Sequence, residues 1–155
     1  SQRMIAEDFE MIPVIRSNQT LLGVITRRAV MDRMSKEQLS GLPTFSEQIS
    51  QKVVLQANHF ELTVEPSMLE KSGVLSNGVL TEVLTTVTRQ LMMNSGKNLI
   101  IEQLLVYYLQ AVQVDDTLRI EARIVRQTRR SAIIDFDLYL NLQLVTKATV
   151  TLKIN

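Results

Sequence analysis

Residues 73–87 read GVLSNGVLTEVLTTV and decide the fold of this 155-residue chain. Through this stretch and just beyond it, apolar residues recur three, four and seven positions apart, the spacing of one buried side of an α-helix: Val79, Leu80, Val83, Leu84, Val87 and Leu91. Gly73 and Gly78 border the preceding loop, and Ser76 or Asn77 can cap the first helical amides. The stretch therefore predicts a loop, a cap and one long helix.

After this helix the chain has the pattern of successive strands with almost no helical periodicity. Residues 99–109 form a nearly continuous apolar run, which we expect to be a central strand buried on both faces. Asp115 and Asp116 predict a turn. Strict alternation of apolar and polar residues then predicts three half-buried strands, at 118–124, 134–140 and 148–154. The sequence thus predicts an α+β domain in which the helix lies against an antiparallel sheet.

One further strand is expected before the helix, over residues 53–64. Its alternation changes frame near Asn58 and His59, which indicates a bulge. His59 is the single histidine of the chain, and no carboxylates are spaced around it as metal ligands would be. We therefore interpret it as a strand-edge residue and predict no metal site.

Charged residues cluster at two places on the predicted sheet. Residues 126–130, RQTRR, fall at a strand turn, where a solvated hairpin tip is favoured over a phosphate site. Asp135 and Asp137 share the polar face of one strand, and with Arg119 and Arg123 on the neighbouring strand they predict a cross-strand charge ladder.

Overall composition narrows the class of protein. Seventeen basic and 16 acidic residues give a net charge of +1, so we expect neither direct nucleic-acid binding nor attraction to an anionic membrane. No apolar run is long enough to cross a bilayer. The absence of cysteine excludes disulfides and thiolate chemistry and is compatible with the cytoplasm. The chain opens at Ser1 within a helical pattern, which predicts further sequence upstream.

The first 36 residues have the pattern strand, turn, strand, helix. The segments IPVI at 12–15 and LGVIT at 22–26 resemble the second half of a CBS motif, a module that binds adenine nucleotides when two copies pair. Gly23 and Thr26 match that family, whereas Ala29 replaces the aspartate that contacts ribose. We expect 1–36 to be a partial CBS motif without its own nucleotide site, 37–51 to be a linker, and 52–155 to be the second domain.

That second domain resembles the hot-dog fold, in which an antiparallel sheet wraps a long central helix. Its loop is similar to that of phenylacetate-pathway thioesterases, whose pattern Asn-x-x-Gly-x-x-His-Gly-Gly precedes an aspartate on the helix. Without gaps, the pattern places Glu70 at the Asn, Ser76 at the His and Asn77 at the middle Gly. The two outer glycines fall on Gly73 and Gly78, and Thr85 occupies the position of the aspartate. The resemblance implies a thioester site at this loop, with Thr81 beside it, and puts ordinary hydrolysis in doubt.

Glu82 keeps an enzymatic alternative open. It lies near Thr85 on the predicted helix, and hot-dog dehydratases carry a glutamate shortly after a similar Gly-Val-Leu helix start. A structural role at the helix surface is the alternative for Glu82. The hydroxyls of Thr81, Thr85, Thr86 and Thr88 either line a polar cleft or bond back to helix carbonyls.

The whole chain resembles regulators that join a DRTGG domain, CBS motifs and a hot-dog domain. This resemblance implies a cytoplasmic sensor that binds an acyl-CoA-like thioester, with an acyl-CoA thioesterase using Glu82 as the alternative. No cofactor is expected in this chain, and an adenine nucleotide would bind only to a complete CBS module. An exposed sheet edge and the resemblance predict a homodimer or higher homo-oligomer.

Overall fold

The computed structural model describes residues 41–93 and 98–155. The chain divides into two compact units, Ser1–Pro43 and Thr44–Asn155, and the second is described here. The predicted partial CBS motif, with Gly23, Thr26 and Ala29, lies outside the described residues. The second unit contains, in order, α3 (Phe45–Lys52), β1 (Val54–Leu55), β2 (Phe60–Thr63), the 3-10 turn η1 (Pro66–Met68), α4 (Asn77–Leu91), β3 (Leu99–Tyr108), β4 (Thr117–Gln127), β5 (Ser131–Leu140) and β6 (Gln143–Ile154).

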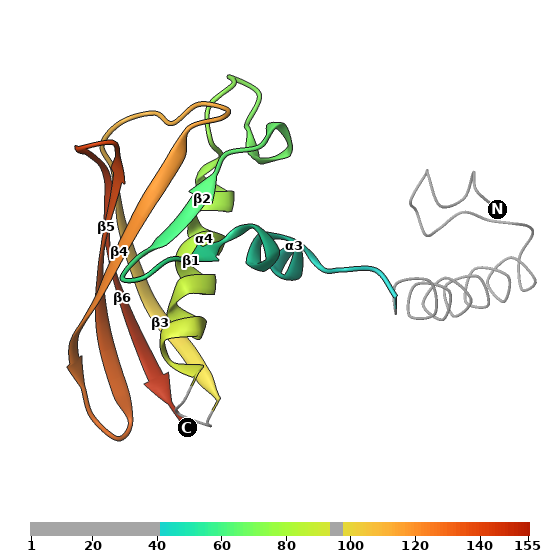
Figure 1. Ribbon diagram of the computed structural model, residues 1–155. Helices are drawn as coiled ribbons and strands as arrows, with labels where there is room; N and C mark the ends of the chain where they lie inside the picture. Colours follow the sequence, from blue (N-terminus) through green and yellow to red (C-terminus); the bar gives the residue numbers. More distant parts are fainter. Residues whose placement is uncertain (1–40, 94–97) are drawn as a thin grey trace, which may run out of the picture. The chain divides into compact units, whose positions relative to one another are not determined.

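The six strands form one antiparallel sheet in the order β1-β2-β4-β5-β6-β3. The long helix α4 lies along one face of this sheet (Figure 1). This is the predicted hot-dog arrangement, a central helix wrapped by an antiparallel sheet. The predicted Asp115–Asp116 turn is also confirmed, because Asp115 has a φ of 71° and the Asp116 carboxylate accepts from the Gln113 amide.

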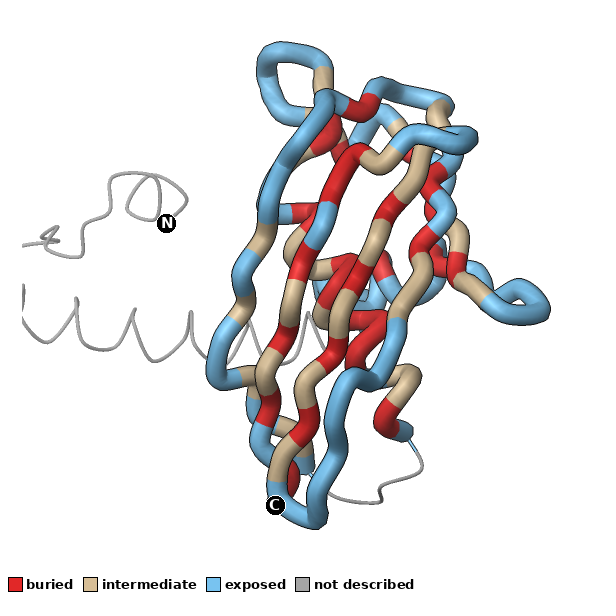
Figure 2. Tube along the Cα trace, turned by 90° about the vertical axis from the view of Figure 1, so that its left-hand side faces the viewer, coloured by how far each residue is buried: buried red, intermediate tan, exposed pale blue. Residues whose placement is uncertain are grey.

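Alternation along the strands creates the core. On β5 every second residue from Ala132 to Leu138 is buried, and on β6 every second residue from Thr146 to Ile154 is buried. Figure 2 shows strands on which buried positions alternate with partly buried or exposed ones. The buried residues meet the apolar side of α4. The largest fully buried side chains include Phe136, Leu138, Leu152, Leu84 and Val87.

The prediction for residues 99–109 was wrong in one respect. They do form a strand, β3, but it is the edge of the sheet rather than a central strand. Leu104 and Val106 pack against the core, whereas Leu105 and Tyr107 on the other face are 49% and 55% exposed. In this chain, a continuous apolar run therefore does not indicate a strand that is covered on both faces.

The expected single strand over 53–64 is also corrected. It is a hairpin, in which β1 and β2 pair antiparallel and the Gln56 amide donates to the His59 carbonyl at 2.8 Å. The change of frame near Asn58 marks the turn between two short strands. β2 then pairs with only residues 117–120 of β4. On its other side, β4 pairs with β5 and has an irregular register there between Ile124 and Arg126.

The expected linker over 37–51 contains a helix, α3, that belongs to the second unit. Thr44 and Glu47 form a reciprocal capping box at its start: the Glu47 amide donates to Thr44 Oγ1, and the Thr44 amide donates to Glu47 Oε1. Ile49 enters the core, and Lys52 pairs with Glu65 at 3.0 Å. The domain boundary therefore falls near Thr44 rather than at 52.

Candidate functional site

The N-terminus of α4 is the centre of the candidate site. Ser76 is its N-cap, as predicted, and its hydroxyl accepts from the amides of Gly78 at 3.1 Å and Val79 at 3.4 Å. Asn77 is the first helical residue, and its amide donates to no group in the described residues. The positive end of a 15-residue helix thus presents one unused amide.

The loop before this helix is held by a tight turn. The Gly73 amide donates to the Glu70 carbonyl at 2.9 Å, and Gly73 has a φ of +92°, a conformation that glycine adopts without strain. The Glu70 carboxylate accepts from Ser72 Oγ at 2.6 Å. Gly73 and Glu70 therefore shape the loop. At Gly78 an added Cβ would meet only Ser76 Oγ, at 3.5 Å, so no close intrachain packing requires glycine there.

A pocket of about 200 Å³ opens beside the unused Asn77 amide. Its walls come from the loop, the first turn of α4, the end of β3 with the segment after it, and β6. Six of its ten lining residues are apolar, but polar atoms make up more of the exposed wall than apolar atoms do. The lining residues are Val74, Leu75, Leu80, Leu109, Ala111, Val112, Asn77, Tyr108, Gln110 and Thr146. The arrangement combines a recess of mixed polarity with a hydrogen-bond donor at a helix N-terminus.

Glu82 does not line this pocket. Since each helical residue turns about 100° around the axis, Glu82 lies roughly 140° from Asn77. Its Oε1 accepts from Ser46 Oγ of α3 at 2.8 Å. The structure therefore places this carboxylate at the contact between the two helices.

Two alternatives were predicted for the helical threonines, lining a polar cleft or bonding back to helix carbonyls, and three of the four do the second. Thr81, Thr85 and Thr88 each donate a hydroxyl hydrogen bond to the carbonyl four residues earlier, at 2.9, 3.1 and 2.8 Å. Thr86 is buried, and none of the four lines the pocket. At Thr85, where the thioesterase pattern has an aspartate, the hydroxyl is occupied by the helix itself.

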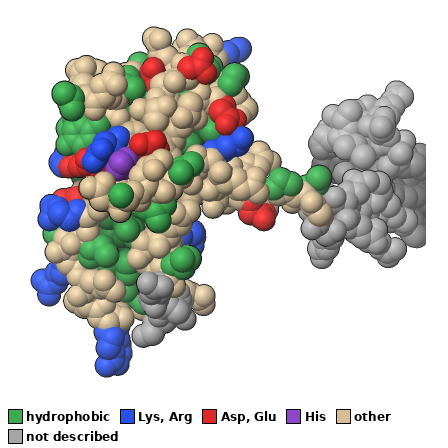
Figure 3. Space-filling view, in the orientation of Figure 1, with side chains coloured by type: hydrophobic (Ala, Val, Ile, Leu, Met, Phe, Trp, Pro, Cys, Tyr) green, Lys and Arg blue, Asp and Glu red, His purple; other side chains and the backbone are tan. Residues whose placement is uncertain are grey.

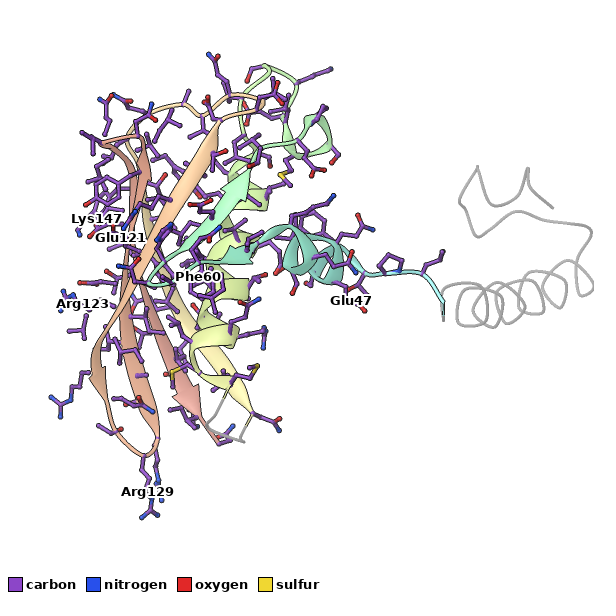
Figure 4. The ribbon with its side chains drawn as sticks, in the orientation of Figure 1. Glu47, Phe60, Glu121, Arg123, Arg129 and Lys147 are labelled. Carbon is purple, nitrogen blue, oxygen red and sulfur yellow. The ribbon has the colours of Figure 1, made fainter. Side chains whose placement is uncertain are left out.

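The predicted charge ladder is confirmed in part. Arg123 pairs across strands with Asp135 at 3.2 Å, but Asp137 pairs with Lys147 of β6 at 2.8 Å, and Arg119 pairs with Glu121 of its own strand. Figure 4 shows Glu121, Arg123 and Lys147 together on the face of the sheet away from α4. The hydrogen bond to Asp137 raises the pKa of Lys147 above its usual value. These charges satisfy one another, as expected of a solvated sheet face.

His59 and the basic turn are structural features of the surface. His59 Nε2 lies 2.9 Å from Glu61 Oε2, and the single histidine, purple in Figure 3, sits among acidic and basic side chains. No group of residues suited to a metal ion occurs in 41–93 and 98–155. Residues 126–130 span the β4–β5 hairpin turn, and Arg129 projects from its tip (Figure 4). The hairpin prediction for this cluster is confirmed.

Of the predicted ligand-binding residues, the structure brings only Asn77 to the pocket. Ser76, Gly73 and Glu70 build the loop that supports it. Sequence reasoning missed the walls from β3 and β6, Thr146 among them. Thr146 could have been noticed as a polar residue in the apolar frame of Ala148, Val150, Leu152 and Ile154.

Comparisons with known proteins agree with this fold. Residues 72–141 match the family model described as the thioesterase superfamily. The uncharacterized protein YtoI of Bacillus subtilis is 23% identical over 165 residues, covering 99% of this chain. This chain spans only 37% of that relative's length.

Solved structures show the same fold at low identity. A hypothetical thioesterase of Streptococcus pneumoniae, solved with coenzyme A, is 23% identical with a TM-score of 0.60, covering 66% of this chain and 84% of its own. The protein smu.793 of Streptococcus mutans, bound to acetyl-CoA, has the same identity and score, with coverages of 67% and 87%. Zebra fish thioesterase superfamily member 2 is 20% identical with a TM-score of 0.67, covering 79% and 94%. The second unit is thus a hot-dog domain.

Proposed function

We propose that the pocket at the N-terminus of α4 binds an acyl-CoA-like thioester, and that the domain senses this ligand rather than hydrolysing it. The observation that carries the proposal is the Asn77 amide, which has no partner in the described residues and belongs to a residue that lines a pocket of about 200 Å³. A thioester carbonyl is a suitable acceptor for such an amide at a helix N-terminus.

Two relatives of the same fold support this ligand class, because their structures contain coenzyme A and acetyl-CoA. The match to the thioesterase superfamily model covers the loop from Ser72, α4 and the sheet as far as Asn141. Adenine nucleotide binding and the regulatory role implied by the CBS resemblance remain proposals about the longer protein. We also propose a cytoplasmic location. No helix of the described residues is long and apolar enough to span a membrane.

Binding is favoured over hydrolysis by the position of the carboxylates. A hydrolase needs a general base or nucleophile within hydrogen-bond reach of the reacting group. Thr85 supplies no carboxylate, and Glu82 faces Ser46 on the other side of the helix from Asn77. The alternative, an acyl-CoA thioesterase that uses Glu82, therefore requires a substrate site on the side of α4 that faces Ser46, away from the pocket that Asn77 lines.

The test is calorimetric titration of the protein with acetyl-CoA and CoA, together with an assay for released thiol. Ala111→Trp should fill the pocket mouth and weaken binding at least 10-fold. Ala57→Trp is the matched control, because Ala57 is an exposed alanine at the β1–β2 turn, away from the pocket. Binding without thiol release is expected. Absence of binding to the unmodified protein, or equal binding by both variants, would overturn the proposal.

A further inference from the structure

Thr146 on β6 is a buried polar residue without a described partner. Its exposed fraction is 1%, yet in 41–93 and 98–155 its hydroxyl makes no hydrogen bond. Buried hydroxyls in proteins are normally paired, because leaving one unpaired costs free energy. This is unlike Thr88, which is equally buried but donates to the Leu84 carbonyl at 2.8 Å.

The direction of the Thr146 side chain is set by the pleat of β6. Side chains two residues apart share one face of a strand, so Thr146 lies on the same face as Ala148 and Val150. Those two residues are buried in the core beside α4. Thr146 also lines the pocket that contains Asn77. Thr146 is thus a buried threonine on the core face of β6 that also lines the recess, where the other buried lining residues are apolar.

We infer that Thr146 determines the ligand's acyl group, selecting a short chain that carries a hydroxyl or keto oxygen near the thioester. This inference rests on the proposed thioester binding. Asn77 and Thr146 line the same recess of about 200 Å³, so an acyl group whose thioester carbonyl accepts from the Asn77 amide would occupy a space that Thr146 borders. A hydrocarbon chain leaves the hydroxyl unpaired, whereas an oxygenated chain pairs with it, since a threonine hydroxyl both donates and accepts.

The experiment compares the affinities of 3-hydroxybutyryl-CoA and butyryl-CoA, which differ by one hydroxyl. We expect the unmodified protein to prefer the hydroxylated ester about 5- to 10-fold, the worth of one net hydrogen bond. Thr146→Val preserves shape and should abolish the preference, and Thr146→Ser should keep it. Thr86→Val is the matched control, because Thr86 is a 6% exposed threonine without a described side-chain partner that lies outside the pocket.

The outcomes separate the two proposals. If neither ester binds the unmodified protein, thioester binding itself fails, and this inference with it. If both bind equally, or if Thr146→Val keeps the preference, only the role of Thr146 is overturned. Thermal unfolding checks the variants, and Thr146→Val should fold at least as stably as the parent because no protein partner loses a hydrogen bond. A loss of preference in Thr86→Val as well would also overturn the assignment.

Discussion

At the scale of single residues, the neighbours Ser76 and Asn77 have different roles at the candidate site. Ser76 uses its hydroxyl to satisfy the amides of Gly78 and Val79, while the Asn77 amide has no partner in the described residues and is available to the proposed ligand. If Ser76 capped less completely, water or a ligand would have to satisfy three amides instead of one. The cap therefore fixes which backbone donor faces the pocket.

Glu82 provides the sharpest test at this scale. Glu82→Gln should leave the affinity for acetyl-CoA within about twofold, because the side chain contacts Ser46 rather than the pocket. Glutamine can still accept the Ser46 hydrogen bond, so stability should change by less than about 0.5 kcal/mol, as for most surface substitutions. Calorimetry and thermal unfolding measure both quantities.

Ser46→Ala is the companion variant and should likewise leave binding unchanged. Thiol release that is present in the parent and disappears in Glu82→Gln would instead make Glu82 the catalytic residue and establish the thioesterase alternative.

At the scale of elements, α3 is short and depends on its first turn. Its eight residues bury only Ile49, so the hydrophobic effect fixes it weakly and the Thr44–Glu47 capping box carries a large share of its order. Hydrogen bonding to Thr44, first through its backbone amide, lowers the pKa of Glu47 below its usual value. α3 also supplies Ser46 to Glu82, so its order affects the outer side of α4.

Removing the cap should therefore have a measurable cost. Thr44→Ala is expected to lower the free energy of unfolding by about 1 kcal/mol. Ser50→Ala, an exposed serine on the same helix, is the control and should not destabilise. Denaturant unfolding gives both values. If the two variants behave alike, the capping box does not stabilise α3.

The capping contribution should also depend on pH. Because the folded pKa of Glu47 is depressed, its contribution is complete above the ordinary glutamate pKa and is lost as the pH falls through the folded value. The stability difference between the parent and Glu47→Gln should therefore shrink on acidification below pH about 4.5. A difference that grows in acid would contradict the lowered pKa.

Elements with a clear periodicity of apolar residues were predictable from the sequence. Elements whose position depends on contacts with distant segments were not. The repeat of Val79, Val83 and Val87 predicted α4, and alternation predicted β4, β5 and β6. β3 was misplaced because strand order depends on pairing between distant segments. α3 was missed although its Thr44-x-x-Glu47 pattern is a capping box. Thr146 shares a pocket with Asn77 only after the chain has folded, so the sequence pattern alone could not assign it to the site.

At the scale of the whole domain, the open edge of the sheet is the feature most relevant to assembly. β3 is a ten-residue edge strand whose outer face exposes Leu105 and Tyr107, and long apolar edges of this kind invite pairing with another chain. We propose a homodimer joined along β3. Such pairing would place a second copy next to Tyr108 and Leu109, which line the pocket.

The double variant Leu105→Lys with Tyr107→Lys should disrupt this dimer. Both side chains are about half exposed, so the fold should survive, while like charges facing each other across a two-fold axis should weaken association. Sedimentation velocity at micromolar concentration should show the parent as a dimer and the variant as a monomer. A monomeric parent would refute the proposal, as would a variant that remains dimeric.

The opposite edge of the sheet limits how far such assembly can go. There the outermost strand, β1, has only two residues, and β2 pairs with only residues 117–120 of β4. Beyond those residues β4 carries Arg123 and Arg126 and bulges against β5 between Ile124 and Arg126. Bulges and charges on an edge discourage the addition of a further strand. If β3 is the edge that pairs and the opposite edge is unfavourable for pairing, the proposed dimer leaves no suitable edge for a third copy. We therefore expect strand pairing to stop at two chains if the proposed dimer forms along β3.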